Sequence, residues 1–153
     1  MTNSSEPGSE VREVRLGATR AEGGTREVSY VIGGERDLPF LGNRPDRLLV
    51  ALEVCDDPRF SPPVVRDYVG DLANNPDEWA RAAERTYGAD LVRLNFTSTK
   101  QRRFDAFGEI ATTMDQVLAA TIRPLIVEGS SEPELDSEVF RRCGEAGEGE
   151  RLL

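Results

Sequence analysis

The sequence contains no histidine, so it lacks the side chain used most often for acid–base catalysis near neutral pH and the commonest zinc ligand. Its two cysteines, Cys55 and Cys143, lie far apart, which argues against a Cys-x-x-Cys metal motif and against a disulfide framework. An iron–sulfur cluster normally takes four thiolates, so we expect none on this chain. Any chemistry must therefore rest on carboxylates, hydroxyls, a thiol or the groups of a partner.

Long hydrophobic runs and an excess of positive charge are also missing. The apolar runs are far shorter than the roughly 20 residues that span a bilayer, and the start MTNSSEPGSE lacks the basic and apolar regions of a signal peptide. Nineteen basic residues against 28 acidic ones give a net charge of -9, which repels nucleic acid and anionic membrane surfaces. We expect a cytoplasmic, soluble protein that binds neither nucleic acid nor membrane.

The length of 153 residues and the 38% hydrophobic content fit one domain with a sizeable core. Residues 1–10 are rich in Ser, Glu, Gly and Pro, and we expect them to be disordered. Residues 11–46 contain two alternating segments, VREVRLG (11–17) and TREVSYVIGG (25–34), with the turn signal AEGG between them. This pattern predicts a β-hairpin followed by a lead-in to the main body.

Residues 47–153 alternate between strand-like and helix-like patterns. The strand-like segments are 47–56, 89–98 and 123–129, and ERLL at the carboxyl terminus is typical of the opening of a fourth strand. A helix is predicted to begin at Asn75-Pro76, and two more cover about 103–121 and 136–146. Such alternation indicates parallel strands with right-handed crossovers. An open doubly wound sheet and a barrel both fit the pattern, and on length alone the open sheet is preferred because a barrel usually takes about 250 residues.

Several phrases of the sequence are similar to a known family. They are RLGATRAEGGTREVSYVIGGERDLPF, NRP, RLLVALEVCD, NPDEWARAAERTYGADLVRLNFTST, RPLIVEGSSEPELDSEV and EGERLL, in this order from about Val11 to Leu153. Together they resemble the delta subunit of the acetyl-CoA decarbonylase/synthase complex, also known as the small subunit of the corrinoid iron-sulfur protein. The GGTR and GGE-x-x-LPF elements and the PDEWA helix start carry most of this resemblance, and no catalytic signature contributes to it.

The resemblance implies a TIM (β/α)8 barrel, of which this chain, with 47–153 as its barrel part, covers about the first half, ending at strand four. It implies a non-catalytic, truncated subunit that supports corrinoid-dependent methyl transfer. The implied partners are the large (gamma) corrinoid iron-sulfur subunit, acetyl-CoA synthase and a tetrahydropterin methyltransferase. The corrinoid would lie at the interface with the large subunit, which also holds the cluster. Two loops, TSTKQRR (97–103) and EGSSEPELDSE (128–138), depart from the usual family pattern.

Strand alternation predicts which side chains face away from the helices. In the first strand, Leu48, Val50, Leu52 and Val54 form the helix-facing set, so Glu53 and Cys55 point to the opposite face. Arg93 and Asn95 hold equivalent positions in the next strand, so Glu53 and Arg93 are expected to pair across the sheet. A polar platform for the cofactor and an internal ion pair that fills a barrel layer are both compatible with such a pair.

Polar residues follow each strand at the end where barrel enzymes bind their ligands. The candidate cofactor-binding residues are Glu53, Asp56, Asn95, Thr97, Ser98, Thr99 and Ser130. Each has a second, structural interpretation, since aspartates and hydroxyls at strand ends commonly serve as turn and helix-capping residues. Cys55 is interpreted as a small core residue, and the long segment 56–75 as a functional loop or an interface.

Three functions remain open at this stage. The first is the corrinoid-supporting subunit, the second is a purely structural or interaction subunit that binds no cofactor, and the third is a stand-alone enzyme of pterin-binding ancestry. The missing histidine and the absence of an assembled acid–base set make the third the least favoured. Half a barrel leaves one sheet face and two edges uncovered, so we also expect the isolated chain to be oligomeric, poorly soluble or complemented by a separately encoded second half.

Overall fold

The computed structural model describes residues 12–34 and 48–153. Within the first range, strands β1 (Glu13–Leu16) and β2 (Tyr30–Gly33) pair antiparallel, which confirms the predicted hairpin. A short 3-10 turn, Arg20–Glu22, lies in the connection between them. The expected disorder of residues 1–10 and the lead-in after the hairpin lie outside the described residues.

The second range forms a mixed α/β unit around a parallel sheet. Strands β3 (Ala51–Cys55), β4 (Leu91–Asn95) and β5 (Leu125–Glu128) pair in the order β3-β4-β5. The parallel pairing confirms the prediction made from the strand and helix alternation. Among the described residues the sheet is open and does not close into a barrel.

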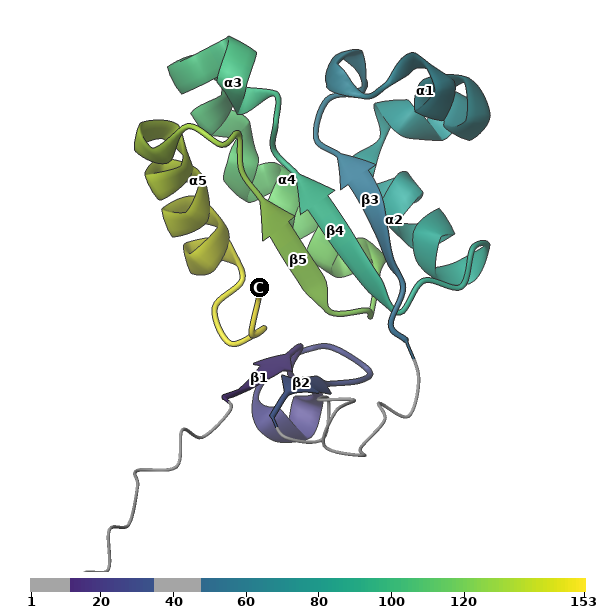
Figure 1. Ribbon diagram of the computed structural model, residues 1–153, viewed down its shortest axis with the longest axis vertical. Helices are drawn as coiled ribbons and strands as arrows, with labels where there is room; N and C mark the ends of the chain where they lie inside the picture. Colours follow the sequence, from purple (N-terminus) through teal and green to yellow (C-terminus); the bar gives the residue numbers. More distant parts are fainter. Residues whose placement is uncertain (1–11, 35–47) are drawn as a thin grey trace, which may run out of the picture.

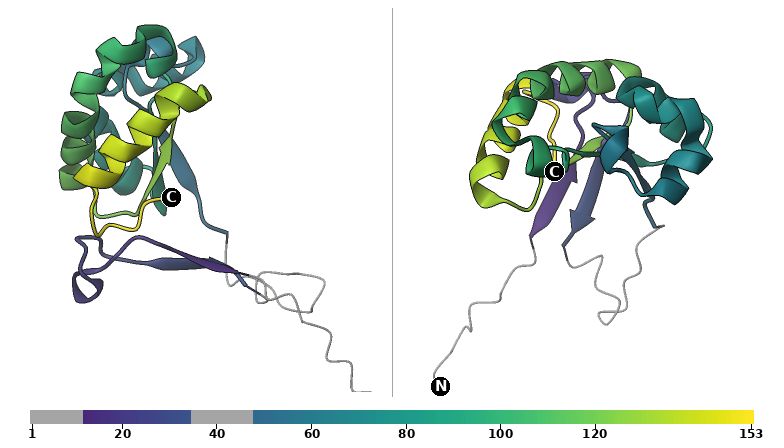
Figure 2. Two further views of the ribbon diagram at one scale, coloured as in Figure 1. Left: turned by 90° about the vertical axis from the view of Figure 1, so that its left-hand side faces the viewer. Right: turned by 90° about the horizontal axis from the view of Figure 1, so that it is seen from above.

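The long helices lie on one side of this sheet. They are α2 (Pro76–Arg85), α4 (Phe107–Ala120) and α5 (Pro133–Ala146), and Figure 2 shows them gathered against one face while the other face has no helix over it. Two shorter helices, α1 (Pro63–Val69) and α3 (Thr99–Arg102), lie in the loops that follow β3 and β4. Within the described ranges, helices therefore cover only one face of the parallel sheet.

The hydrophobic core lies between the covered face and the three long helices. Val54, Val92, Leu94 and Leu125 point from the strands into this layer, and Trp79, Ile110, Met114 and Val139 meet them from the helices. All eight side chains are nearly or fully buried. The strand alternation thus sorted the helix-facing residues of the sheet correctly from Leu52 onward.

The first strand is shorter than the sequence predicts, because β3 begins at Ala51 rather than at residue 47. Leu48 and Val50, assigned to the helix-facing set, are exposed. The backbone carbonyl of Val50 nonetheless accepts hydrogen bonds from Asp90 and Leu91 at the start of β4. The pairing partner in β4 starts only there, so the apolar residues before Ala51 have no neighbouring strand or covering helix among residues 12–34 and 48–153.

The segment 56–75 is more structured than a loop. It forms a 3-10 turn at Pro58–Phe60, helix α1 and a second 3-10 turn at Gly70–Asn74. The three prolines at positions 58, 62 and 63 suit this arrangement, because a proline is favourable at the first turn of a helix. In α5 the prediction of the start was late by three residues, and Phe140 is about half exposed.

The residues after α5 return to the sheet. Arg151–Leu153 are not part of a strand, but Leu153 donates its N–H to the Leu125 carbonyl and accepts a hydrogen bond from the Val127 N–H at 2.7 Å. This alternation of bonds with residues on either side of Ile126 is the pattern of a parallel pair. Leu153 thus lies beside β5, on the side away from β4.

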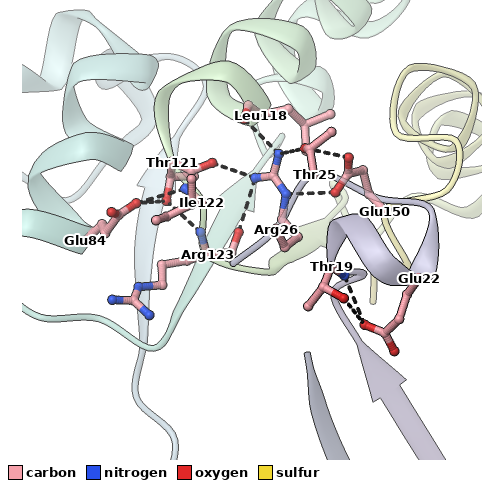
Figure 3. Close-up of polar contacts among 10 residues, drawn as sticks. All are labelled: Thr19, Glu22, Thr25, Arg26, Glu84, Leu118, Thr121, Ile122, Arg123 and Glu150. Atoms are coloured by element: carbon pink, nitrogen blue, oxygen red, sulfur yellow. Dashed lines mark hydrogen bonds and ion pairs between the residues drawn. The ribbon is translucent and has the colours of Figure 1, made fainter. Parts of the chain in front are cut away.

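The hairpin lies beneath the amino ends of the parallel strands, as Figure 1 shows. The contact is built around Arg26, which is 4% exposed and whose guanidinium has acceptors for all five N–H groups. Its Nε bonds Glu150 at 2.7 Å, and its two terminal nitrogens bond the Thr25 hydroxyl and the carbonyls of Leu118, Thr121 and Arg123 (Figure 3). Arg26 therefore joins the hairpin to the last turn of α4 and to the residues that follow α5.

None of the helices in residues 12–34 and 48–153 has the length and apolar character that a membrane crossing requires.

Candidate functional site

The carboxyl end of the sheet, opposite the hairpin, collects most of the polar residues predicted from the sequence. Asp56 directly follows β3, and its backbone N–H donates to the Asn95 carbonyl at the end of β4. One carboxylate oxygen, Oδ2, accepts a hydrogen bond from the Ser98 hydroxyl, whereas the other, Oδ1, is buried and has no hydrogen-bond partner among the described residues. The structure thus brings Asp56, Asn95 and Ser98 together as the sequence predicts.

Burial of the Asp56 side chain raises its pKa to about 6, and the nearby charge of Asp57 adds to this rise. The hydrogen bonds from Ser98 and the charge of Arg102 act in the opposite direction but do not cancel the effect. A buried carboxylate with one unsatisfied oxygen is costly, since each lost hydrogen bond leaves a desolvated group. Asp56 therefore keeps its proton to a higher pH than an ordinary aspartate does.

The adjacent residue, Asp57, behaves in the opposite way. Hydrogen bonds from the Arg59 guanidinium lower its pKa, and both of its oxygens accept bonds from Arg59. Asp57 also begins the 3-10 turn Pro58–Phe60, accepting a hydrogen bond from the Arg59 N–H at 3.0 Å. The predicted turn and capping role therefore fits Asp57, whereas Asp56 caps no turn in the described part of the chain and has a raised pKa. Divergent pKa values in neighbouring carboxylates are a feature of functional sites.

The hydroxyls after β4 are mostly engaged within the protein. Thr99 is fully buried and donates to the Phe96 carbonyl at 2.6 Å, and Ser98 is fully buried against Asp56. The Asn95 side-chain oxygen accepts the Thr97 N–H at 2.8 Å, which shapes the turn out of the strand. Thr97 is only half-buried, so its side chain is the most accessible of this group.

Ser130, the candidate after β5, is tied to the start of α5. Its N–H and its hydroxyl both donate to the Asp136 carboxylate, at 2.6 and 2.8 Å, and its hydroxyl accepts the Glu132 N–H. These bonds close the turn that leads into the helix. Ser130 is nearly fully buried, so the geometry favours the turn-forming role over contact with a ligand.

Glu53 and Arg93 are paired across β3 and β4, as the sequence predicts. They are opposite each other in the register, and their side chains meet at 3.0 Å. Arg93 also pairs with Glu128 of β5, a partner that the sequence did not reveal. All three side chains lie on the helix-free face and are about 40% exposed. The face opposite the core therefore carries one cation between two anions, open to solvent.

Cys55 is buried at the end of β3, and this burial raises the pKa of its thiol to about 11. A thiol with this pKa stays protonated and is a poor nucleophile or metal ligand, in line with the predicted core role. Within residues 12–34 and 48–153, no group of three or more side chains of the kinds that bind metal ions comes together.

The carboxyl end combines a carboxylate that titrates near neutral pH, an accessible threonine and a solvent-open ion triad. Such a surface can donate and accept hydrogen bonds and exchange a proton, and the Ser98 hydroxyl that donates to Asp56 is fully buried. Sequence reasoning missed Glu128, Arg59 and Arg102 here. It also missed Arg26 and Glu150 at the other end, although both lie in phrases (GGTR and EGERLL) that carried the family resemblance.

Taken together, the hairpin and the one-sided parallel sheet define a mixed α/β protein whose polar residues gather at the carboxyl ends of the strands. Comparison with known proteins then shows which mixed α/β proteins this chain is similar to. No protein-family model matches the chain. Individual relatives do: the acetyl-CoA decarbonylase/synthase complex subunit delta of Methanopyrus kandleri is 40% identical over 146 residues, which cover 94% of this chain and 36% of the relative.

The corresponding subunit delta of Archaeoglobus fulgidus is 40% identical over 147 residues, covering 94% of this chain and 32% of the relative. Subunit delta 1 of Methanosarcina acetivorans is 33% identical along the whole of this chain and 36% of its own length. The chain is thus homologous to the delta subunit of the acetyl-CoA decarbonylase/synthase complex over most of its length. It spans about a third of the length of these relatives.

Proposed function

We propose that the chain is part of a subunit that supports corrinoid-dependent methyl transfer in an acetyl-CoA decarbonylase/synthase complex. The observation that carries this proposal is the 33–40% identity to delta subunits along 94–100% of the chain. The proposed partners are the large (gamma) corrinoid iron-sulfur subunit, acetyl-CoA synthase and a tetrahydropterin methyltransferase. The subunit itself is proposed to be non-catalytic, because no catalytic signature contributes to the resemblance.

The proposed cofactor contact is at the carboxyl end of the sheet, where a corrinoid held by the large subunit would meet this chain. A corrinoid carries amide side chains, which donate hydrogen bonds to carboxylates and hydroxyls. Thr97 and Glu53 offer such groups in accessible positions, and Asp56 offers one if the loop before α1 opens. Asn95, Ser98, Thr99 and Ser130 support the shape of this end through their internal bonds.

We further propose that residues 47–153 are part of a (β/α)8 barrel, with residues 11–46 as the hairpin and lead-in. The succession of parallel strands with helices on a single face supports this, because in such a barrel the helices form one outer ring. The position of Leu153 beside β5 supports it as well, since a fourth strand would pair there. The helix-free face would then be the barrel interior, filled in part by the triad of Glu53, Arg93 and Glu128.

The test is to produce this chain together with the large corrinoid-binding subunit from the same genome and to measure co-elution and the cobalamin absorption spectrum. Co-elution with a spectral change on addition of this chain is the expected result. Failure to bind the large subunit would overturn the proposal.

A structural or interaction subunit that binds no cofactor is the second candidate. It is favoured by the internal engagement of Ser98, Thr99 and Ser130, whose hydroxyls already donate to protein acceptors. Binding of the large subunit without any change in the cobalamin spectrum would support this candidate over the first. Thr97→Val is the sharpest variant here, because it removes an accessible hydroxyl and keeps the side-chain volume.

A further inference from the structure

The loop after β4 presents an exposed phenylalanine at the carboxyl end of the sheet. Phe104 lies in the 3-10 turn Arg103–Ala106 between α3 and α4 and is 69% exposed. Its ring meets the Phe107 ring edge to face, with 5.6 Å between ring centroids. Exposed aromatic side chains are enriched among the residues that anchor protein interfaces.

Arginines lie over both of these rings. The Arg103 guanidinium is 5.8 Å from the centre of the Phe104 ring, and the Arg142 guanidinium of α5 is 5.7 Å from the centre of the Phe107 ring. Arg142 is fixed by Glu138 and by the Phe107 carbonyl. Arg103, in contrast, is exposed and makes no ion pair with any residue in the described ranges. Its charge is available to a carboxylate from outside.

The backbone at Arg103 has an unusual conformation. Its φ is 50° and its ψ is -128°, a combination that side chains larger than glycine rarely adopt. A non-glycine residue in this region costs on the order of 1–3 kcal/mol, and such strain is concentrated at binding and switch sites. Here it separates α3 from the following turn and directs Arg103 and Phe104 outward from the end of the sheet.

The charge of this loop opposes that of the whole chain. Residues 99–106 contain three basic residues, Lys100, Arg102 and Arg103, and one acidic residue, Asp105, whereas the whole protein has a net charge of -9. Glu109 neutralises Arg102 through two bonds, and Lys100 lies 3.6 Å from Glu132. Arg103 is therefore the cation of this loop that has no ion-pair partner among the described residues, and the nearby Asp105 carries one opposing charge. A long polyanion would meet the negative remainder of the surface, whereas a compact acidic patch on a protein would meet only this loop.

We propose that Arg103 and Phe104 form a docking site for an acidic surface of the large corrinoid-carrying subunit, with Phe104 entering an apolar pocket and Arg103 pairing with a carboxylate at its rim. This inference rests on the proposed function for the identity of the partner. The site adds a charge-specific contact to the interface, so that the loop after β4 selects the partner surface while the sheet end meets the cofactor.

The experiment measures the dissociation constant and the association rate of the full chain with the large subunit, for wild type and four variants. Arg103→Glu is expected to weaken binding about tenfold or more, mainly through a slower association that depends less on salt. Phe104→Ala is expected to weaken it about tenfold or more, and Phe104→Leu to restore part of the loss. The control is Arg85→Glu, an exposed arginine at the end of α2, which should change affinity no more than about twofold. Thermal unfolding of each variant checks that the fold is kept.

The possible outcomes distinguish failure of the docking site from failure of the proposed function. If wild type binds the large subunit and Arg103→Glu binds as well as Arg85→Glu, the docking site is wrong and the proposed function stands. If wild type does not bind the large subunit, the proposed function fails first. Wild-type binding to double-stranded DNA, or to vesicles containing phosphatidylglycerol, that Arg103→Glu abolishes would overturn the protein partner. A change in the oligomeric state of Arg103→Glu would indicate a second copy of this chain as the occupant, which also overturns the proposal.

Discussion

Two buried charged side chains, one at each end of the parallel sheet, differ in how completely their polar atoms are satisfied, although Nε of Arg123 at the amino end also has no hydrogen-bond partner among the described residues. At the amino end, Arg26 is buried with an acceptor for each of its five N–H groups, and its ion-pair partner Glu150 is also bonded by Thr25. At the carboxyl end, Asp56 has a buried oxygen with no partner and a pKa raised to about 6. The contacts of Arg26 at the amino end are those of a structural anchor, whereas Asp56 at the carboxyl end has the contacts expected in a ligand-binding site.

This contrast has an energetic meaning. A buried charge with a complete set of partners fixes one arrangement of the chain, whereas a buried carboxylate that lacks a partner lowers stability and is retained where another molecule uses it. Parallel α/β folds in general place ligands at the carboxyl ends of their strands and leave the amino ends to stability. The following changes test whether the two ends of this sheet differ in the same way.

The largest effect is expected at the amino end, for Arg26→Ala. The variant leaves the Glu150 carboxylate buried without its cation and removes the donors to the carbonyls of Leu118 and Thr121, so it should lower the free energy of unfolding by about 3–5 kcal/mol. Urea denaturation followed by circular dichroism gives this value. Arg20→Ala, at an exposed position of the same hairpin, is the control and should stay near wild type. If Arg26→Ala lowers the free energy of unfolding by less than about 1 kcal/mol, the contacts of Arg26 do not anchor the hairpin to the sheet.

Arg26 also shows what sequence reasoning could reach and what it could not. Local periodicity predicted the hairpin, the parallel strands and the pairing of Glu53 with Arg93, because each depends on neighbours a few residues away or on strand register. The contact between Arg26 and Glu150 joins positions 124 residues apart, and no local pattern encodes it. The exposure of Leu48 was missed for a related reason, since its coverage depends on where the pairing with β4 begins.

The candidate site was predicted in the same uneven way. Strand ends located Asp56, Ser98 and Ser130, because residues after parallel strands meet at one edge of a sheet. Their different roles follow from three-dimensional neighbours: Asp136 engages Ser130, while nothing in the described residues engages Oδ1 of Asp56. A polar residue just after a strand is therefore a turn residue in one case and a candidate ligand contact in the other.

The second prediction concerns the close packing of the hairpin against β5. Gly17 has a φ of +76°, and a Cβ there would lie 2.6 Å from Cγ of Pro124 and 2.8 Å from the Val28 carbonyl oxygen. Gly17→Ala is therefore expected to lower the free energy of unfolding by about 2–4 kcal/mol.

Gly144→Ala is the matched control for Gly17→Ala. Gly144 lies in α5, where an added Cβ meets no atom within 4 Å, so the change should raise stability by about 0.5–1 kcal/mol. Thermal unfolding of both variants measures the two shifts. Shifts of the same sign would contradict the tight junction between the hairpin and the sheet.

At the carboxyl end, Asp56→Asn is expected to stabilise the protein. Because burial raises the pKa of Asp56 in the folded state to about 6, from an ordinary value near 3.8, the folded protein binds the proton more tightly than the unfolded chain. The contribution of Asp56 to wild-type stability therefore falls as pH rises between about 4 and 6. Asp56→Asn lacks this loss, so it should exceed wild type by about 1–3 kcal/mol at pH 8 and match it near pH 3.5. Chemical denaturation at several pH values measures the difference.

The neighbouring carboxylate supplies the opposite control. Hydrogen bonds from Arg59 lower the pKa of Asp57, so its ionised form contributes stability that is present above the ordinary pKa and is lost as pH falls through the lowered one. Asp57→Asn should therefore destabilise the protein at pH 7, with a difference that shrinks in acid. If both asparagine variants shift stability in the same direction at pH 8, the contrast between an unsatisfied and a satisfied carboxylate is wrong.

The smallest effect is expected on the helix-free face, for Glu53→Gln. Arg93 keeps Glu128 as a partner in this variant, and the side chains are more than a third exposed, so solvent screens the lost charge. The free energy of unfolding should change by no more than about 0.5 kcal/mol. A larger loss would assign Glu53 to structure, together with Arg26, and would remove it from the candidate cofactor contacts. If Glu53→Gln instead keeps its stability but binds the corrinoid-carrying subunit differently, the triad of Glu53, Arg93 and Glu128 belongs to the proposed binding surface. A group that contacts the partner can affect binding without affecting the fold.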